Sequence, residues 1–422
     1  MRAFRSTLAT GLLSVAVFVA ALEVGLRLVP AAIPLAVLQH FEQGLRSHIA
    51  SRRKLSTKKD TVLVPRDDGG PADRMWIYRP EAEIHYDFDE PRIVPRIRVD
   101  KQGFCNPDPA AYNDTPSFDV VVVGDSFSWC LAVEPSDAWP ARFEALTGLT
   151  TYNLGQPGRG LYEYLQLLKN RGLRKSPRIV VMNVYEGNDF RDAFFFHKAR
   201  TERGSAVARQ TCPFDSAMVC DLLEHANNSF LGRHSYAYNL LAAGAWQLAA
   251  SADKNEIDFR YQVTFSDGSR VEMNSTNADR DEVEFAHRLE DGRLDLTLFD
   301  TALAEFRDLA EQWGFVPVLL YTPSAYSAYE GMTTFDDPNI ERTMRNYSNS
   351  LRRYFAAKAR ELGFRYLDLT PRLAAAARAS SADDLLYFRT NVHFTQSGHR
   401  TVATQLAELV RAELGSLPGG IN

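Results

Sequence analysis

The residues of this sequence best suited to chemistry are a serine and a histidine that lie far apart in the chain. Ser126 follows Gly124-Asp125 directly after the apolar run Val120 to Val123, and His393 stands near the C-terminus. A serine at the carboxyl end of a parallel strand faces the crevice where open α/β sheets bind their ligands. A histidine within hydrogen-bond reach could take its proton, so the pair predicts acyl transfer through a covalent serine intermediate.

Two further segments could supply the hydrogen-bond donors that acyl transfer needs for its oxyanion. Asn153 to Gly158 reads Asn-Leu-Gly-Gln-Pro-Gly, and Glu186 to Asp189 reads Glu-Gly-Asn-Asp. Each segment follows an expected core strand, as Ser126 does, so the three should meet along one edge of a sheet. We therefore predict an oxyanion hole made of the Ser126 and Gly158 amides and the Asn188 side chain.

A parallel sheet is needed to bring these segments together, and the sequence predicts one. Short apolar runs alternate with amphipathic helical stretches, a pattern typical of βαβ units with helices on both faces. We expect strands at 119–123, 151–154, 178–184, 316–321 and 365–367, and helices at 139–146, 161–171, 301–313, 339–362 and 401–414. Residues 191 to about 298 break the alternation and include a hairpin-like piece at 261–273, which indicates an insertion.

The four chemical segments resemble the SGNH hydrolase superfamily, also called the GDSL esterases. The blocks of that family centre on a Ser, a Gly, an Asn and a His in this order, and Ser126, Gly158, Asn188 and His393 match them. The resemblance covers about 116 to 415 without the insertion. It implies a flavodoxin-like three-layer α/β sandwich with a central parallel sheet. Membrane-anchored members of similar kind serve in O-acetylation or deacetylation of bacterial exopolysaccharides.

One position departs from the family pattern. In the family an Asp two or three residues before the catalytic histidine orients its ring, and this sequence has Asn391 and Thr390 there. Asn391 can accept from the histidine through its carbonyl oxygen but has no charge to stabilise imidazolium. Three interpretations stay open: Asn391 orients His393 in a slower triad; Asp383, Asp384 or a backbone carbonyl replaces the Asp; or the protein only binds.

Other polar residues near these segments are expected to be structural. Asp125 should make a hydrogen bond within its turn, and Asp189 should fix the turn that carries Asn188. His399 follows Gly398 at the start of the last helix, where it resembles the Gly-His pair often found shortly after the catalytic histidine of the family.

The first thirty residues differ in kind from the rest and predict a membrane anchor. Ser6 to Leu22 carries no charge, and Glu23 and Arg27 follow at a spacing that lets them pair on one helix face. An apolar run of about 20 residues is long enough to cross a bilayer. A cleaved signal peptide is the alternative. The positive charges near the N-terminus favour a body on the extracytoplasmic, or periplasmic, side in either case.

Composition narrows the function further. The 422 residues carry a formal net charge of −5, so the basic excess of a nucleic-acid-binding protein is missing. Neither a cofactor nor a metal is expected, since P-loop, dinucleotide and zinc-ligand motifs do not occur. Cys212 and Cys220 could close a small disulfide loop, whereas Cys105 and Cys130 fit a bridge and free thiols equally well.

We therefore expect residues 1–30 as anchor, 31–115 as tether and β-rich lead-in, and 116–420 as a hydrolase-like domain with an insertion at about 191–298. The expected function is a serine esterase or O-acyltransferase with an acyl-Ser126 intermediate. The expected substrate is an acetylated cell-surface or exported polysaccharide, or another ester. The alternatives are a catalytically weakened glycan-binding or assembly protein, and a thioesterase or lipase acting on acyl chains.

Overall fold

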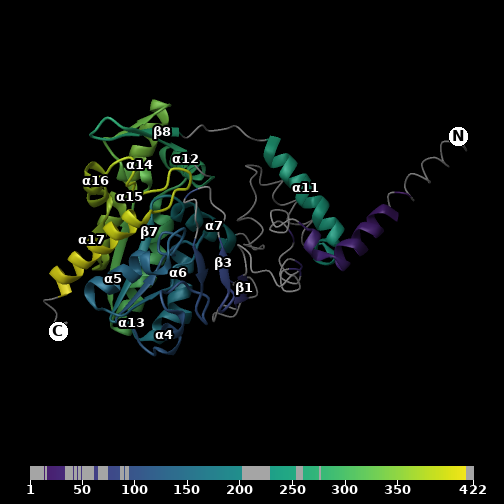
Figure 1. Ribbon diagram of the computed structural model, residues 1–422, viewed down its shortest axis with the longest axis horizontal. Coiled ribbons are helices and arrows are strands. Elements are labelled where there is room, and N and C mark those ends of the chain that lie inside the picture. Colours follow the sequence, from purple (N-terminus) through teal and green to yellow (C-terminus); the bar gives the residue numbers. More distant parts are fainter. Residues whose placement is uncertain are drawn as a thin grey trace, which may run out of the picture. The chain divides into compact units, whose positions relative to one another are not determined.

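The computed structural model describes residues 14, 17–33, 41, 45, 49, 61–64, 75–85, 90, 95–201, 229–252, 260–274 and 277–414 (Figure 1). The chain forms two compact units. The smaller unit takes residues 1–55 and 199–256, and the larger unit takes residues 56–198 and 257–422. The predicted insertion at 191–298 is thus divided between the two units.

A five-stranded parallel sheet forms the centre of the larger unit. Its strands are β5 (Val120–Val123), β6 (Thr151–Asn153), β7 (Ile179–Tyr185), β10 (Val316–Thr322) and β12 (Arg365–Asp368). Every residue of β5, β6 and β7 is buried. Burial on both faces explains why β5 and β7 read as nearly unbroken apolar runs. All five expected strands are confirmed to within one or two residues.

The strand order is β12-β10-β7-β5-β6, which is the flavodoxin-like order predicted for this chain. The chain first moves from β5 outward to its neighbour β6. It then returns past β5 to β7 and continues in that opposite direction to β10 and β12. Because parallel connections are right-handed, this reversal puts the first connecting helix on one face and the later ones on the other. Ligands bind where the direction reverses, so the carboxyl ends of β5 and β7 mark the expected crevice.

The helices of the larger unit include the five expected from the sequence and others that were not expected. The main ones are α5 (Trp139–Thr147), α6 (Leu161–Leu167), α7 (Asp189–Thr201), α12 (Asn277–Glu290), α13 (Asp300–Trp313), α15 (Pro338–Leu362), α16 (Thr370–Ala379) and α17 (Gln396–Leu414). Shorter helices are α4 (Pro109–Asp114) and α14 (Ala325–Ala328). Helices α13 and α15 stop at Gly314 and Gly363, whose φ angles are +74° and +73°. Helix α17 lies along α5 (Figure 1).

The structure differs from the expected helices at α17, α6 and α16, among other places. Helix α17 begins five residues before the expected 401, because residues 396–400 are polar and lack the apolar spacing that marks a helix. Helix α6 ends at Leu167 and continues as a π-helical turn from Leu168 to Gly172. Helix α16 was not expected, since its run of alanines has little periodicity.

Short antiparallel pairs flank the central sheet. Strand β1 (Thr61–Val64) pairs with β2 (Met75–Tyr78), and β3 (Glu83–His85) pairs with β4 (Arg96–Arg98). The hairpin expected at 261–273 is confirmed as β8 (Arg260–Thr264) and β9 (Arg270–Asn274), and β11 (Thr333–Phe335) extends it. Its turn contains Gly268 with φ +83°, a left-handed conformation that favours glycine.

The smaller unit contains α10 (Phe230–His234), α11 (Tyr236–Ala252) and a helix over residues 17–28. The expected pair on that helix is present, with the Arg27 guanidinium 2.6 Å from the Glu23 carboxylate. The same carboxylate accepts from Ser235 Oγ and the Ala237 amide, both at 2.8 Å. Residues 1–13 of the predicted anchor lie outside the described residues, and within those described no helix has the length and apolarity to cross a bilayer.

Candidate active site

The structure brings Ser126 and His393 together from positions 267 residues apart. Ser126 lies just after β5, and His393 lies in the loop that precedes α17. The Nε2 atom of His393 is 2.8 Å from the Ser126 Oγ. This distance suits direct transfer of the serine proton to the imidazole ring.

The other nitrogen of the His393 ring faces Asn391. Nδ1 lies 3.0 Å from the Asn391 Oδ1, and the same oxygen accepts from the His393 backbone amide at 3.1 Å. A carbonyl oxygen opposite Nδ1 requires the proton on Nδ1, which leaves Nε2 as the acceptor for Ser126. The carboxylate of Asp384, considered as a replacement orienter, instead accepts from the Ser397 hydroxyl.

His393 is half-buried in an aromatic setting that keeps its ring neutral. Burial lowers the pKa of His393 to about 3. The Phe127 ring stacks on the imidazole at a centroid distance of 5.1 Å, and the Tyr185 ring stacks on Phe127 at 3.8 Å. A neutral imidazole is the form that can act as a general base.

The turn that carries Ser126 is tightly packed. A Cβ atom on Gly124 would come within 2.3 Å of the Ser128 Oγ, so only glycine fits there. The Asp125 carboxylate is fully buried and accepts from the Phe127 amide at 2.8 Å, the structural hydrogen bond that the sequence indicates. Burial, with the nearby Asp192 charge, raises the pKa of Asp125 to about 7. Asp125 thus holds the turn that carries Ser126.

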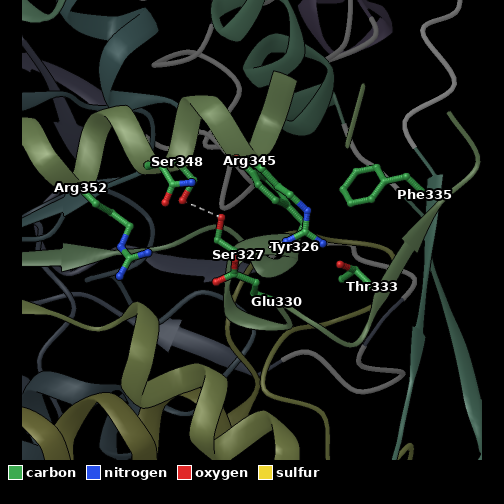
Figure 2. Close-up of a pocket in the computed structure, with 9 residues that line it drawn as sticks. Tyr326, Ser327, Glu330, Thr333, Phe335, Arg345, Ser348 and Arg352 are labelled. Atoms are coloured by element: carbon green, nitrogen blue, oxygen red, sulfur yellow. Dashed lines mark hydrogen bonds and ion pairs between the residues drawn. The ribbon is translucent and has the colours of Figure 1, made fainter. Parts of the chain in front are cut away.

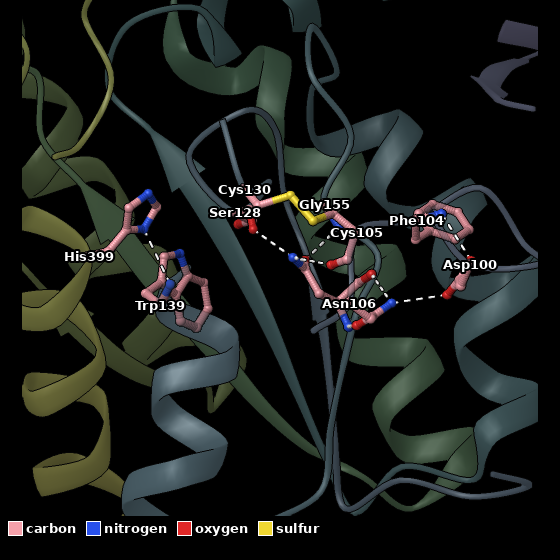
Figure 3. The surroundings of a disulfide bond; sticks show 10 residues. Asp100, Phe104, Cys105, Asn106, Ser128, Cys130, Trp139, Gly155 and His399 are labelled. Atoms are coloured by element: carbon pink, nitrogen blue, oxygen red, sulfur yellow. Dashed lines mark hydrogen bonds between the residues drawn. A yellow bond between two sulfur atoms is a disulfide. The ribbon is translucent and has the colours of Figure 1, made fainter. Parts of the chain in front are cut away.

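A disulfide ties this turn to the lead-in segment that precedes β5 (Figure 3), and a buried asparagine at the end of β6 contacts both. Cys105 and Cys130 are bridged, with their Cα atoms 6.3 Å apart, whereas Cys212 and Cys220 lie outside the described residues. The Asn153 side chain donates to the carbonyls of Ser128 at 2.7 Å and Cys105 at 3.3 Å. Sequence reasoning left the bridge open and did not single out the Asn153 contacts, because they join segments without a local pattern.

The predicted oxyanion residue Gly158 lies in the turn between β6 and α6. Its φ angle is +69°, and a Cβ atom there would meet nothing within 4 Å. The segment that carries Gly158 is fastened to the turn that carries Ser126, since the Gln156 amide donates to the Gly124 carbonyl at 2.9 Å. The amide of Gly158 thus belongs to a turn whose start is held against the turn that carries Ser126.

The predicted oxyanion residue Asn188 lies in the turn between β7 and α7. Its side-chain amide donates to Asp192 at 2.8 Å, which uses one of its two N–H groups. Asp189 fixes this turn, because it accepts from the Tyr185 amide at 2.8 Å and from the Tyr164 hydroxyl at 2.6 Å. Ser126, Gly158 and Asn188 therefore lie in turns that follow the three adjacent strands β5, β6 and β7.

His399 has a structural position one turn into α17. Its Nδ1 accepts from the Trp139 backbone amide at 3.2 Å, at the first residue of α5 (Figure 3). Burial first, and then the charges of His393 and Arg142, lower the pKa of His399 to about 3. A neutral His399 thus satisfies a backbone donor that α5 leaves open.

A separate pocket lies beside α15, away from the residues just described. Figure 2 shows Ser327, Ser348 and Arg345 among its lining residues, and neither Ser126 nor His393 is one of them. The buried Glu186 carboxylate accepts from the hydroxyls of Ser327 and Ser348. In the part of the chain that the structure describes, no group of three His, Cys, Asp or Glu could hold a metal ion.

Comparisons with known proteins give solved structures only, since no family model and no curated protein matches. The chain is similar to a catalytic mutant of an acetylxylan esterase from Geobacillus stearothermophilus (TM-score 0.36, 11% identity, 69% of this chain and 94% of the other). It is similar to an extracellular lipase from Streptomyces rimosus (TM-score 0.35, 15% identity, 70% and 99%). It is also similar to a proposed SGNH hydrolase from Slackia heliotrinireducens (TM-score 0.32, 15% identity, 70% and 99%).

Proposed function

We propose that this protein is a serine ester hydrolase or O-acyltransferase of the SGNH type. The observation that carries the proposal is the line of contacts from Ser126 Oγ to His393 Nε2 at 2.8 Å and from His393 Nδ1 to Asn391 Oδ1 at 3.0 Å. A nucleophile, a base and a group that orients the base are the parts that covalent acyl transfer requires.

In the first half of the reaction, Ser126 Oγ attacks the ester carbonyl while His393 Nε2 takes the hydroxyl proton. The carbonyl oxygen becomes an oxyanion, which the amides of Ser126 and Gly158 and the side chain of Asn188 stabilise by hydrogen bonds. The carbon–oxygen bond to the leaving alcohol then breaks, and His393 returns its proton to that alcohol. Acyl-Ser126 is the product of this half.

In the second half, His393 activates an acceptor hydroxyl, which attacks acyl-Ser126 and releases the serine. Water as acceptor makes the protein an esterase, and a sugar hydroxyl makes it an O-acyltransferase. The proton again passes to His393 and then back to Ser126 Oγ, so the enzyme ends as it began. Imidazolium forms in both halves beside a neutral Asn391, which makes each step slower than with an aspartate.

The substrate that we propose is an acylated cell-surface or exported polysaccharide, with the protein held at a membrane by its N-terminal helix. The uncharged run from Ser6 to Leu22 supports the anchor. The Cys105–Cys130 bridge supports an extracytoplasmic body, because disulfides persist mainly in oxidising compartments.

The test is ester turnover by the full-length protein in detergent. Wild type, Ser126→Ala and the control Ser350→Ala would be compared for release of p-nitrophenol from its acetate ester and for labelling by a fluorophosphonate. We expect turnover and labelling in wild type and Ser350→Ala only. Adding acetylated or free oligosaccharides then separates hydrolysis from transfer, since transfer adds acetyl groups to the free sugar.

A second function, glycan binding without catalysis, is favoured by the neutral Asn391 beside His393. A folded wild type that neither labels nor turns over any ester, yet binds acetylated oligosaccharide in calorimetry, would replace the enzyme with this binder. Loss of that binding in Ser126→Trp, which would fill the space at the serine, would place the glycan at the same crevice.

A further inference from the structure

The orientation of the Asn391 side chain is set by contacts on both of its ends. Its Nδ2 donates to the backbone carbonyl of Glu90 at 2.9 Å, and its Oδ1 accepts from the His393 amide at 3.1 Å. Turning the amide over would put oxygen against the Glu90 carbonyl and N–H against the His393 amide. Both hydrogen bonds would become repulsive contacts, and the group is buried at 6% exposure.

The direction of this amide decides which nitrogen of His393 carries the proton. With Oδ1 toward the ring, Nδ1 is protonated and Nε2 can accept from Ser126. With Nδ2 toward the ring, Nδ1 would be the bare nitrogen and Nε2 would carry the proton. That form cannot take the serine proton, and in a serine enzyme such an exchange costs about 10⁴ in kcat.

Glu90 is itself held in place by its own side chain. Its carboxylate accepts from the Arg389 amide at 2.7 Å and the Thr390 amide at 3.1 Å, and it pairs with the Arg389 guanidinium at 3.2 Å. Glu90 therefore binds the loop just before Asn391 through its side chain, and its backbone carbonyl accepts from the Asn391 side-chain amide. Glu90 is 299 residues from Arg389, so this contact joins the lead-in segment to the histidine loop.

We infer that Glu90 is a positioning residue, which holds Asn391 in the orientation that leaves His393 Nε2 free to accept the Ser126 proton. This inference rests on the proposed function for its catalytic consequence. The orienting contact itself can be measured without any turnover. Glu90 thus provides, in two steps, the tautomer control that an aspartate provides directly in the family that the chain resembles.

The test combines kinetics with NMR of the ring nitrogens in the full-length protein labelled with ¹⁵N-histidine. The His393 signals would be assigned by their absence in His393→Gln. We expect Nδ1–H and a bare Nε2 in wild type, and a mixture of tautomers in Glu90→Ala. The kcat for p-nitrophenyl acetate should fall by about 10-fold or more in Glu90→Ala, with KM within about twofold, because only the reactive population of the base changes.

Matched variants separate positioning from general destabilisation. Glu90→Gln keeps the carbonyl and one acceptor oxygen for the two loop amides, so it should retain the wild-type tautomer and lose less than about threefold in kcat. Glu311→Ala removes an exposed carboxylate on α13 and should change neither readout. If Glu90→Ala does not fold, Glu90→Asp withdraws the carboxylate by one methylene and should shift the tautomer in the same direction.

Unchanged tautomer and kcat in folded Glu90→Ala would overturn the inference while leaving the esterase intact. If Glu90→Ala shows the expected tautomer change but even wild type turns over no ester, the inference is supported and the proposed enzymatic function is contradicted. The two failures are therefore distinct.

Discussion

The nucleophile turn and the histidine loop are held in different ways. The turn around Ser126 is fully packed, with a disulfide to Cys105 and a hydrogen bond of 3.0 Å from Asn183 to the Ser128 hydroxyl. The loop from 385 to 395 is also anchored in the core, through Tyr387 and Phe394, but its residues 389–391 are held by Glu90, whose side chain is 21% exposed. The turn that carries Ser126 is thus fixed by core packing alone, whereas the orientation of His393 also depends on a contact that solvent can reach.

The largest expected effect is the loss of the nucleophile itself. Ser126→Ala should lower kcat for p-nitrophenyl acetate by about 10⁴ or more, which is about 5.5 kcal/mol, because no other group can form the acyl intermediate. The urea midpoint should stay near that of wild type, since the turn is held by its neighbours. Full turnover in Ser126→Ala would contradict the role of Ser126 as nucleophile.

The second-largest effect is expected from the disulfide that holds the turn carrying Ser126. Replacing both Cys105 and Cys130 by Ala should lower the free energy of unfolding by about 3 to 4 kcal/mol, as expected for a bridge that closes a loop of 25 residues. Urea unfolding of the double variant measures this loss. The kcat at low temperature should change little if packing alone still fixes the turn. A stability equal to that of wild type would show that the bridge adds nothing to the packing.

The histidine loop should respond in the opposite way, with a large kinetic effect and a small effect on stability. Asn391→Ala should lower kcat by about 10², or about 2.7 kcal/mol, because the ring of His393 loses its orienting acceptor. Asn391→Asp should raise the pKa of His393, since a carboxylate within 3.0 Å of Nδ1 favours imidazolium. The acid limb of kcat/KM should therefore move to higher pH. An acid limb at the same pH in wild type and Asn391→Asp would contradict a contact between residue 391 and the His393 ring.

The smallest expected effect is the pH dependence of stability that His393 and His399 cause. Below about pH 6.5 the unfolded chain takes up protons at His393 and His399, whereas the folded chain does not until about pH 3, so stability falls as pH falls between these values. Each histidine contributes at most about 1.4 kcal/mol per pH unit. His399→Gln, whose side-chain oxygen can still accept from Trp139, should remove one of the two contributions.

Urea unfolding of wild type and His399→Gln at pH 7 and pH 5 checks this. Burial raises the pKa values of Asp125 and Glu186, which favours the fold in acid, but these groups are the same in both proteins and cancel in the difference. An equal loss of stability in the two proteins between pH 7 and pH 5 would mean that His399 does not titrate on unfolding.

The sequence predicted what is local and missed what joins distant segments. The runs at β5 and β7 and the segments after them are contiguous patterns, so the parallel strands and the meeting of Ser126 with His393 could be expected, whereas the strand order was implied only by the family resemblance. Asn391 opposite His393 could also be expected, since the two are close in sequence. Glu90 could not, because 301 residues separate it from Asn391 and no pattern marks it. The pairing of Cys105 with Cys130 stayed open for the same reason.

The separation of 267 residues between Ser126 and His393 also bears on the chain during its synthesis. Domains emerge from the ribosome N-terminus first, so β5, β6 and β7 can pair before residue 393 has been made. A Cβ on Gly398 would come within 2.2 Å of the Leu386 carbonyl, so the start of α17 must dock tightly for the histidine loop to close. In a nascent or truncated chain Ser126 therefore has no base beside it, and the proposed attack on esters must wait until the last helix is in place.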